Sequence, residues 1–126
     1  MSGKRALILL GGTWHDFAGF AGSVSPLLAA EGLAPAPTYD PDELLRLSGG
    51  DCELVLLYTC LGRAEGNTDG TGLAKLTDAQ IEALVTWVHG GGALLGVHSA
   101  TVMGESSPAL GALLGGTFVS HPARHA

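Results

Sequence analysis

The sequence predicts an α/β domain built on an open parallel β-sheet with helices on both faces. Short apolar runs alternate along the 126-residue chain with segments whose apolar residues have helical spacing. Apolar residues make up 46% of the sequence and charged residues only 14%, which is typical of strands that are buried on both faces. The length suits one domain, so we interpret residues 1–126 as a single domain.

The first strand–helix unit begins near the N-terminus. Residues 6–10 form a continuous apolar run that stops at Gly11 and Gly12, which is typical of a buried strand that leads into a loop. Apolar residues between positions 17 and 28 recur at steps of three and four and therefore predict a helix. Asp16, which directly precedes this segment, is expected to cap the helix.

The second unit predicts a weak strand and a helix. Residues 34–39 contain two prolines, which cannot donate backbone hydrogen bonds within a sheet, so this strand is expected at a sheet edge. Asp40 is a suitable helix cap, and Pro41 suits the first helical position. We expect the helix to bury its leucines and to end before Gly49.

The second half of the chain predicts three further strands. These are expected at residues 54–58, 93–97 and 117–120. Thr77 and Gln80 form a capping box, which predicts a helix that ends at a run of three glycines. A short helix is expected over residues 107–114. Residues 62–75 are rich in glycine, threonine and aspartate and have no periodicity, so they predict a long loop.

Residues 96–100, with the sequence Gly-Val-His-Ser-Ala, have the pattern of a nucleophile elbow. Such a turn lifts its middle side chain clear of the sheet edge. Here the middle residue is His98, and imidazole suits proton transfer or metal ligation better than acyl transfer. Ser99 lies one position too late to be the elbow nucleophile, which argues against a conventional serine hydrolase.

The parallel topology predicts that several polar side chains converge. The carboxyl ends of parallel strands meet at one edge of the sheet, and ligands bind at that edge. We define the predicted pocket by the residues that follow the expected strands and that we assign to catalysis or substrate binding: Gly11, Gly12, Trp14, His15, His98, Ser99 and His121.

Each side chain of the predicted pocket also has a structural interpretation. His98 could be bonded to backbone under a loop, and His15 could belong to the first turn of a helix. His121 precedes a proline, which keeps its backbone extended and lets its side chain face either the cleft or the last helix. Trp14 is either a stacking platform or an interior anchor.

Charge and hydropathy exclude two classes of partner. The formal net charge is −6, and the six basic residues are scattered, so no stripe of positive charge is present to bind nucleic acid. The first apolar run is too short for a signal peptide or a membrane span.

Cys52 and Cys60 flank one expected strand and are too far apart to form a disulfide. We expect reduced thiols, with Cys60 the more exposed, and a cytoplasmic location.

Four segments in register resemble the ThuA-like (trehalose utilisation) family of the class I glutamine amidotransferase-like superfamily. They are residues 11–17, 76–78, 91–101 and 115–122. The resemblance implies a flavodoxin-like sheet, an elbow without the amidotransferase cysteine, and a connection to disaccharide metabolism. It carries His15, His98, Ser99 and His121 over as pocket residues.

Two departures from that family affect the expectations. Members generally continue past the His-Pro pair at 121–122 into further strands, whereas this sequence stops at Ala126. Either the sequence is a natural short form or a fragment, or a partner chain completes its sheet. A missing edge strand would leave backbone groups unpaired, which favours a homodimer across that edge. The segment 102–110 also lacks the aromatic residues expected between the elbow and the next strand, so one pocket wall is expected to differ.

The sequence therefore favours a ThuA-like protein that acts on a sugar or sugar derivative. In this interpretation His98 is the acid or base, and His15 and His121 orient the substrate or share protons. Trp14 stacks on the sugar, and amides near Gly11, Gly12 and Ser99 bind its oxygen atoms.

Two alternatives remain open at the level of sequence. One is a binding or assembly module that has the same fold and no activity. The other is a zinc-dependent hydrolase with His15, His98 and His121 as its three ligands, although no local motif supports this site and no cofactor is otherwise expected. Amide transfer from glutamine ranks last because the elbow has no thiol.

Overall fold

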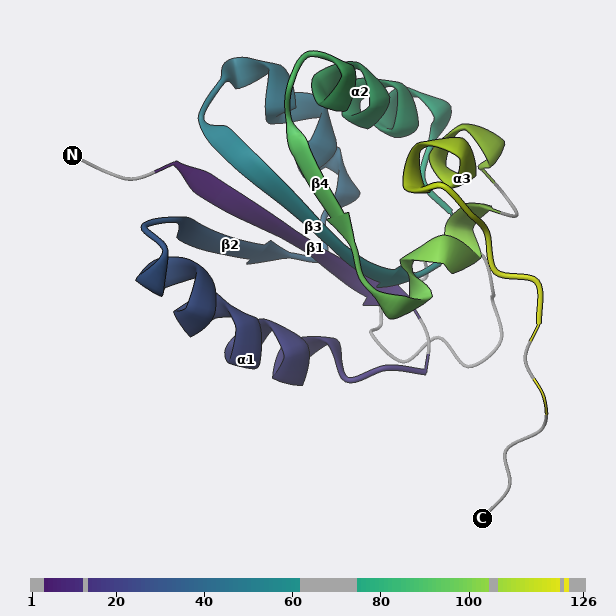
Figure 1. The fold of residues 1–126 in the computed structure, drawn as a ribbon, viewed down its shortest axis with the longest axis horizontal. Helices are drawn as coiled ribbons and strands as arrows, with labels where there is room; N and C mark the ends of the chain where they lie inside the picture. Colours follow the sequence, from purple (N-terminus) through teal and green to yellow (C-terminus); the bar gives the residue numbers. More distant parts are fainter. Residues whose placement is uncertain (1–3, 13, 62–74, 105–106, 121, 123–126) are drawn as a thin grey trace.

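A parallel β-sheet forms the centre of the computed structural model, which describes residues 4–12, 14–61, 75–104, 107–120 and 122 (Figure 1). The strands of the described residues are β1 (Arg5–Gly12), β2 (Ala34–Thr38), β3 (Cys52–Cys60) and β4 (Ala93–Gly96). All neighbouring strands are parallel, and the strand order is β2-β1-β3-β4. This order is the flavodoxin-like arrangement as far as its fourth strand. The open parallel α/β sheet expected from the sequence is confirmed.

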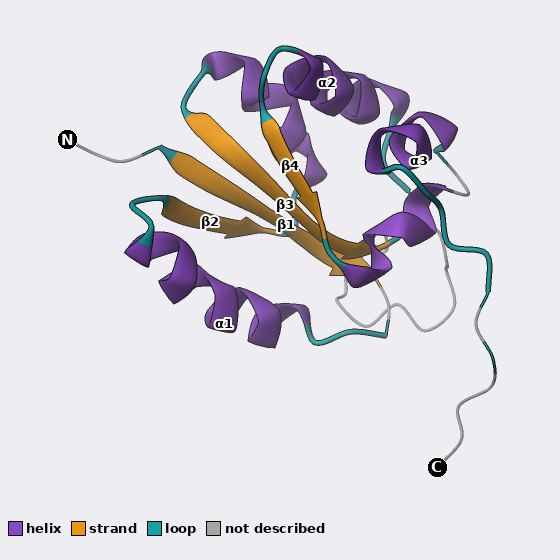
Figure 2. Cartoon of the chain, viewed as in Figure 1, coloured by secondary structure: helices purple, strands orange, loops and turns teal. Residues whose placement is uncertain are grey.

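Helices cover both faces of the sheet, as expected. The α-helices are α1 (Phe17–Ala30), α2 (Asp78–His89) and α3 (Pro108–Leu114), and the 3₁₀ helices are η1 (Pro41–Gly49) and η2 (His98–Gly104). Figure 2 shows α1 alone on one side of the strands and η1, α2 and α3 on the other. Among the described residues, none of the helices combines the length and hydropathy that a membrane span requires.

Strand β1 is the centre of the core because it lies between two other strands and is covered on both faces. Leu7 and Leu9 pack with the leucines of η1 and α2, whereas Ile8 and Leu10 pack against α1. All four side chains are at most 3% exposed. Burial of this kind stabilises a domain by about 1.5–3 kcal/mol for each large aliphatic side chain.

Side-chain caps fix the helix boundaries that the sequence indicates. The Asp16 carboxylate accepts a hydrogen bond from the Gly19 amide at 2.9 Å. Thr77 and Gln80 form the expected reciprocal capping box. Gln80 Nε2 also donates to Asp42 Oδ1 at 2.8 Å, so the start of α2 is tied to η1.

The edge position of β2 follows from its prolines. The Ala34 amide donates to the Lys4 carbonyl, directly before β1, at 2.9 Å. Because amides alternate in direction along a strand, the nitrogen atoms of Pro35 and Pro37 face away from β1. Proline has no N–H to offer a further strand, so these residues stop the sheet at β2.

The helix expected after Asp40 is a 3₁₀ helix. Its buried residues are Pro41, Leu44 and Leu47, which are three positions apart. Side chains at i and i+3 are eclipsed in a 3₁₀ helix, so this period places all three on the core side.

The fifth strand expected at residues 117–120 does not form. The Phe118 amide donates to the Thr101 carbonyl at 3.1 Å, and the Thr117 hydroxyl donates to the same oxygen at 3.1 Å. These bonds attach the segment to η2, and β4 is the edge of the described sheet. The expectation that Cys60 is more exposed than Cys52 is also wrong: β3 extends to Cys60 and leaves it 4% exposed, against 7% for Cys52. The expected loop at 62–75 lies, apart from Lys75, outside the described residues.

Gly12 is predicted to be irreplaceable for stability. Its φ is +117°, and a Cβ there would overlap the carbonyl group of Cys60. We expect Gly12→Ala to lower the free energy of unfolding by about 2–4 kcal/mol, measured by chemical denaturation.

Gly22→Ala is the matched control, because Gly22 lies in α1 and a Cβ added there would meet no other atom within 4 Å. Removal of a helical glycine should raise stability by about 0.5–1 kcal/mol. Equal effects of the two substitutions would contradict the close approach of β1 and β3.

Candidate functional site

A sharp turn follows β4 and carries His98. The strand ends at Gly96, and η2 begins at His98, whose φ is +47°. A left-handed conformation is uncommon for a residue other than glycine, and in enzymes it often marks a functional position. Residues 96–100 thus form a turn with the local geometry expected of an elbow.

Bonds to β3 hold this turn in place. The Val97 amide donates to the Leu57 carbonyl at 2.9 Å. The Ser99 hydroxyl donates to the Thr59 carbonyl at 2.9 Å, and Ser99 is 5% exposed. The Thr59 hydroxyl in turn donates to the Met103 sulfur at 3.1 Å. The Ser99 side chain therefore anchors the elbow, which leaves the exposed His98 as its outward-facing residue.

The fold brings His15 and His98 together although they are 83 positions apart in the sequence. Their ring centroids are 5.0 Å apart, and the rings meet edge to face at 73°. His15 follows β1 and His98 follows β4, and both of these strands are neighbours of β3. The two imidazoles therefore meet at the carboxyl edge of the sheet. His121, the third expected histidine, lies outside the described residues.

An aromatic wall supports His15. The Tyr58 and Phe17 ring centroids lie 5.7 Å and 5.9 Å from that of His15. Phe20 contacts Tyr58 from α1, with ring centroids 4.4 Å apart. Burial raises the pKa of the Tyr58 phenol, and electrostatic interactions with Asp16 and Cys60 raise it further. The phenol is thus neutral at physiological pH and can donate a hydrogen bond.

Sequence reasoning missed Tyr58. Its position near the carboxyl end of β3 could have indicated it. Tyr58 is two positions from Cys60, so both side chains lie on the same face of the sheet. That this face is the one covered by α1 depends on how β3 pairs with β1, which is a property of the folded sheet.

The loop after β1 combines buried glycines with an exposed tryptophan. Gly11 and Gly12 have φ values of +133° and +117°, which only glycine adopts without strain. Trp14 is 66% exposed, with φ of +71°. Its indole is therefore accessible to a ligand and is not the interior anchor of the alternative interpretation.

No group of three or more histidine, cysteine or acidic side chains is placed to hold a metal ion within the described part of the chain. The three-histidine zinc site would need His121, which is not described. His15 and His98 are the two members of that expected set whose positions are known.

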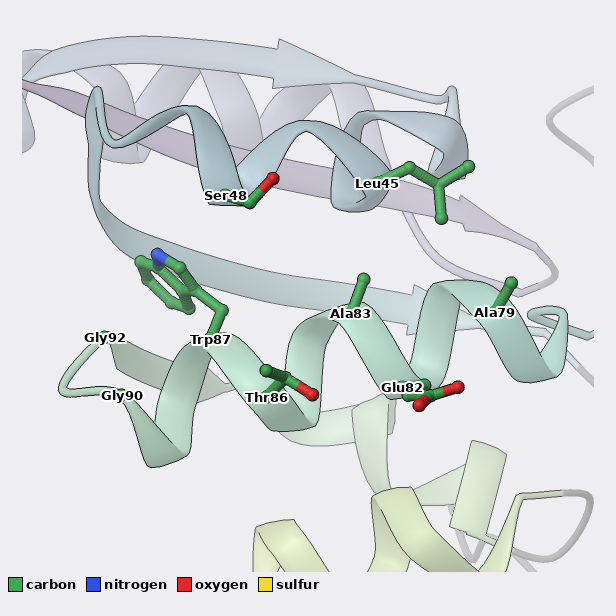
Figure 3. A pocket seen from close by; sticks show the side chains of 9 residues that line it. All are labelled: Leu45, Ser48, Ala79, Glu82, Ala83, Thr86, Trp87, Gly90 and Gly92. Carbon is green, nitrogen blue, oxygen red and sulfur yellow. The ribbon is translucent and has the colours of Figure 1, made fainter.

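A surface hollow lies elsewhere, between η1 and α2 (Figure 3). Its volume is about 500 Å³. The lining residues are Leu45, Ser48, Ala79, Glu82, Ala83, Thr86, Trp87, Gly90 and Gly92. None of them belongs to the predicted pocket, so this hollow and the histidine pair are separate features.

Comparison with known proteins identifies the fold. No protein-family model and no curated protein matches the chain. Among solved structures, it is similar to a protein from Bacteroides uniformis ATCC 8492 that is described as ThuA-like, with a TM-score of 0.51 and 20% sequence identity. This chain has a ThuA-like fold.

The match covers 78% of this chain and 37% of the Bacteroides protein. The chain thus spans little more than a third of the length of the ThuA-like protein that it matches. At this identity the similarity establishes the architecture, and the activity has to be argued from the site.

The backbone strain at His98 leads to a stability prediction. His98→Gly and His98→Ala both remove the imidazole, but only glycine is relaxed at φ of +47°. We expect the glycine variant to be more stable than the alanine variant by about 1 kcal/mol in chemical denaturation. An alanine variant as stable as the glycine variant would contradict the left-handed elbow.

Proposed function

We propose that this ThuA-like chain binds a small carbohydrate at the carboxyl edge of its sheet and performs acid–base chemistry there with His98. The observation that carries the proposal is the pair of imidazoles 5.0 Å apart, one of them on a strained elbow. Proton transfer near neutral pH is the chemistry to which imidazole is best suited. The substrate class, a disaccharide or an oxidised derivative, follows from the family resemblance.

The neighbouring groups supply binding and orientation in this proposal. The exposed indole of Trp14 offers a stacking surface for a sugar ring. The neutral phenol of Tyr58 lies against His15 and keeps its ring in one orientation. Because the Ser99 hydroxyl is engaged by Thr59, we assign oxygen binding to backbone amides near Ser99, Gly11 and Gly12.

His98 would remove or return a proton at the substrate, and His15 would exchange that proton or orient the bound sugar. We assign to His121 the role that the sequence suggests, which is to orient the substrate or share protons. We also propose a cytoplasmic location, which agrees with the presence of two buried free cysteines, Cys52 and Cys60.

The proposal is tested by histidine variants with disaccharides and their oxidised forms as substrates. We expect His98→Ala to reduce turnover by about 10²–10⁴-fold, the usual contribution of an acid–base residue, with a smaller loss for His15→Ala. His89→Ala is the control, since His89 is exposed at the end of α2. Turnover in His98→Ala equal to that of wild type would remove the catalytic role.

A second candidate function, an assembly module, is favoured by β4, which is the edge of the sheet among the described residues. β4 contains Leu95, which is 51% exposed. Leu95 pairs in register with Leu56, which faces α1, so it lies on that face of the sheet. Figure 1 shows α1 beneath β1 and β2, away from β4. We propose that a second copy of the chain covers this edge, because residues 93–97 have no charge or proline to prevent strand pairing.

Dimerisation is tested by Leu95→Lys. Light scattering after size exclusion should give a dimer for wild type and a monomer for this variant, because two lysines on the same face of the paired β4 strands would repel each other. Leu27→Lys is the matched control, as Leu27 is 67% exposed on α1. A monomeric wild type at high concentration would rule out this assembly.

A further inference from the structure

We propose that the hollow between η1 and α2 binds a small organic ammonium ion. Its volume of about 500 Å³ lies within the range of small-molecule sites in proteins. Trp87 and Glu82 of α2 are the residues that recognise the ion, and Ser48 and Thr86 add hydroxyl groups to the lining. The site is separate from the histidine pair at the carboxyl edge of the sheet and does not depend on the function proposed above.

The hollow exists because α2 presents small residues to η1. The two helices pack through leucines that belong to the core. Ala79 and Ala83, which are one helical turn apart, project toward η1 beyond that core (Figure 3). Their methyl groups are too short to fill the space that the larger leucines set between the helices. The hydrogen bond from Gln80 to Asp42 ties the two helices together, so the hollow is preformed.

The turn after α2 holds the indole of Trp87 at one end of the hollow. The Gly92 amide donates to the Trp87 carbonyl at 3.0 Å. A Cβ at Gly92 would lie 2.4 Å from ring atoms of the indole, so the glycine lets the ring lie directly on the backbone. Trp87 is half-buried and lines the hollow, which leaves part of its ring accessible to a ligand. Tryptophan attracts a cation over its ring more strongly than the other aromatic side chains do.

Glu82 gives the hollow a negative charge. It is the only charged side chain among the described residues that line the hollow. No ion pair involves Glu82 within the described part of the chain. Asp78 lies four positions earlier on α2, hence on the same side of the helix, and adds to the negative potential. Arg46 of η1 forms an ion pair with Glu43. The charge of the hollow is therefore complementary to a cation.

The rest of the lining defines the body of the ligand. Leu45 of η1 and Ala83 of α2 supply apolar surface, which suits methyl or methylene groups attached to the nitrogen. The Ser48 and Thr86 hydroxyls can bond to a hydroxyl group carried by the same molecule. An anion would be repelled by Glu82, and a neutral ligand of the same shape would gain the apolar contacts alone. A substituted ammonium ion uses the indole, the carboxylate and the apolar surface together.

The proposal is tested by calorimetric titration of the full chain with choline at low ionic strength. The matched neutral probe is 3,3-dimethyl-1-butanol, in which carbon replaces the charged nitrogen of choline. We expect saturable binding of one choline per chain, about fivefold tighter or more than binding of the neutral alcohol. Absence of saturable choline binding in the millimolar range would overturn the proposal, as would equal affinity for the two probes.

Substitutions within the hollow locate the bound ion. We expect Trp87→Leu to weaken choline binding by about 2- to 30-fold, because leucine has no aromatic ring. Glu82→Gln should weaken it by about two- to fivefold, and Ala83→Leu should block it by filling the hollow. The control is Glu31→Gln, because Glu31 is exposed at the end of α1 on the other face of the sheet. Choline affinity that is unchanged in both Trp87→Leu and Glu82→Gln would overturn the site.

Fluorescence provides a second measurement that leaves Trp87 in place. The chain has two tryptophans, and Trp14 is 66% exposed, so Trp14→Phe makes Trp87 the only emitter. We expect choline to change its emission saturably, at the same concentrations as in calorimetry. Adding Glu82→Gln should move the curve to concentrations about two- to fivefold higher. Emission that is unaffected at choline concentrations that saturate the calorimetric signal would place the ion elsewhere and overturn the proposal.

Discussion

The attachment of the β4 turn to β3 is the constraint on which the candidate site depends. Two hydrogen bonds, from the Val97 amide to the Leu57 carbonyl and from the Ser99 hydroxyl to the Thr59 carbonyl, hold the chain on both sides of His98. A free chain would avoid the left-handed conformation at this residue, which costs about 1–2 kcal/mol. The sheet imposes it, and the imidazole is consequently directed to the carboxyl edge, where the ring of His15 lies 5.0 Å away.

The same constraint explains why a serine follows the histidine. Ser99 is buried, and its hydroxyl donates a hydrogen bond to the Thr59 carbonyl. This serine therefore holds the turn in place and is not a nucleophile. The reactive position and the residue that secures it are therefore adjacent. A site of this kind combines local strain with support from the sheet, which is common where geometry serves binding or catalysis.

Much of the fold could be predicted from the sequence because its signals are local. The apolar run before Gly11, the capping box at Thr77 and the prolines of the edge strand each specify an element without knowledge of the rest of the chain. The false fifth strand at 117–120 shows the limit of this approach. The residues of this segment have high β-propensity, but in the folded chain Thr117 and Phe118 donate hydrogen bonds to the Thr101 carbonyl of η2. The sequence alone does not show which partner such a segment will bond to.

The site was predictable only in outline. The rule that parallel strands end at one edge brought His15 and His98 together correctly, since it depends on topology alone. Tyr58 was missed because its contact with His15 depends on which face of β3 meets α1, and that is a tertiary property. The exposure of Leu95 on β4 likewise could be recognised only from the folded sheet, in which α1 lies over β1 and β2.

The account depends most on the proximity of two imidazoles that are distant in sequence. Nuclear Overhauser spectroscopy of the aromatic protons in solution measures this proximity directly, and the Phe20–Tyr58 contact, with centroids 4.4 Å apart, provides an internal reference. We predict a cross-peak between ring protons of His15 and His98. A spectrum that contains the Phe20–Tyr58 cross-peak and none between these two histidines would contradict the account.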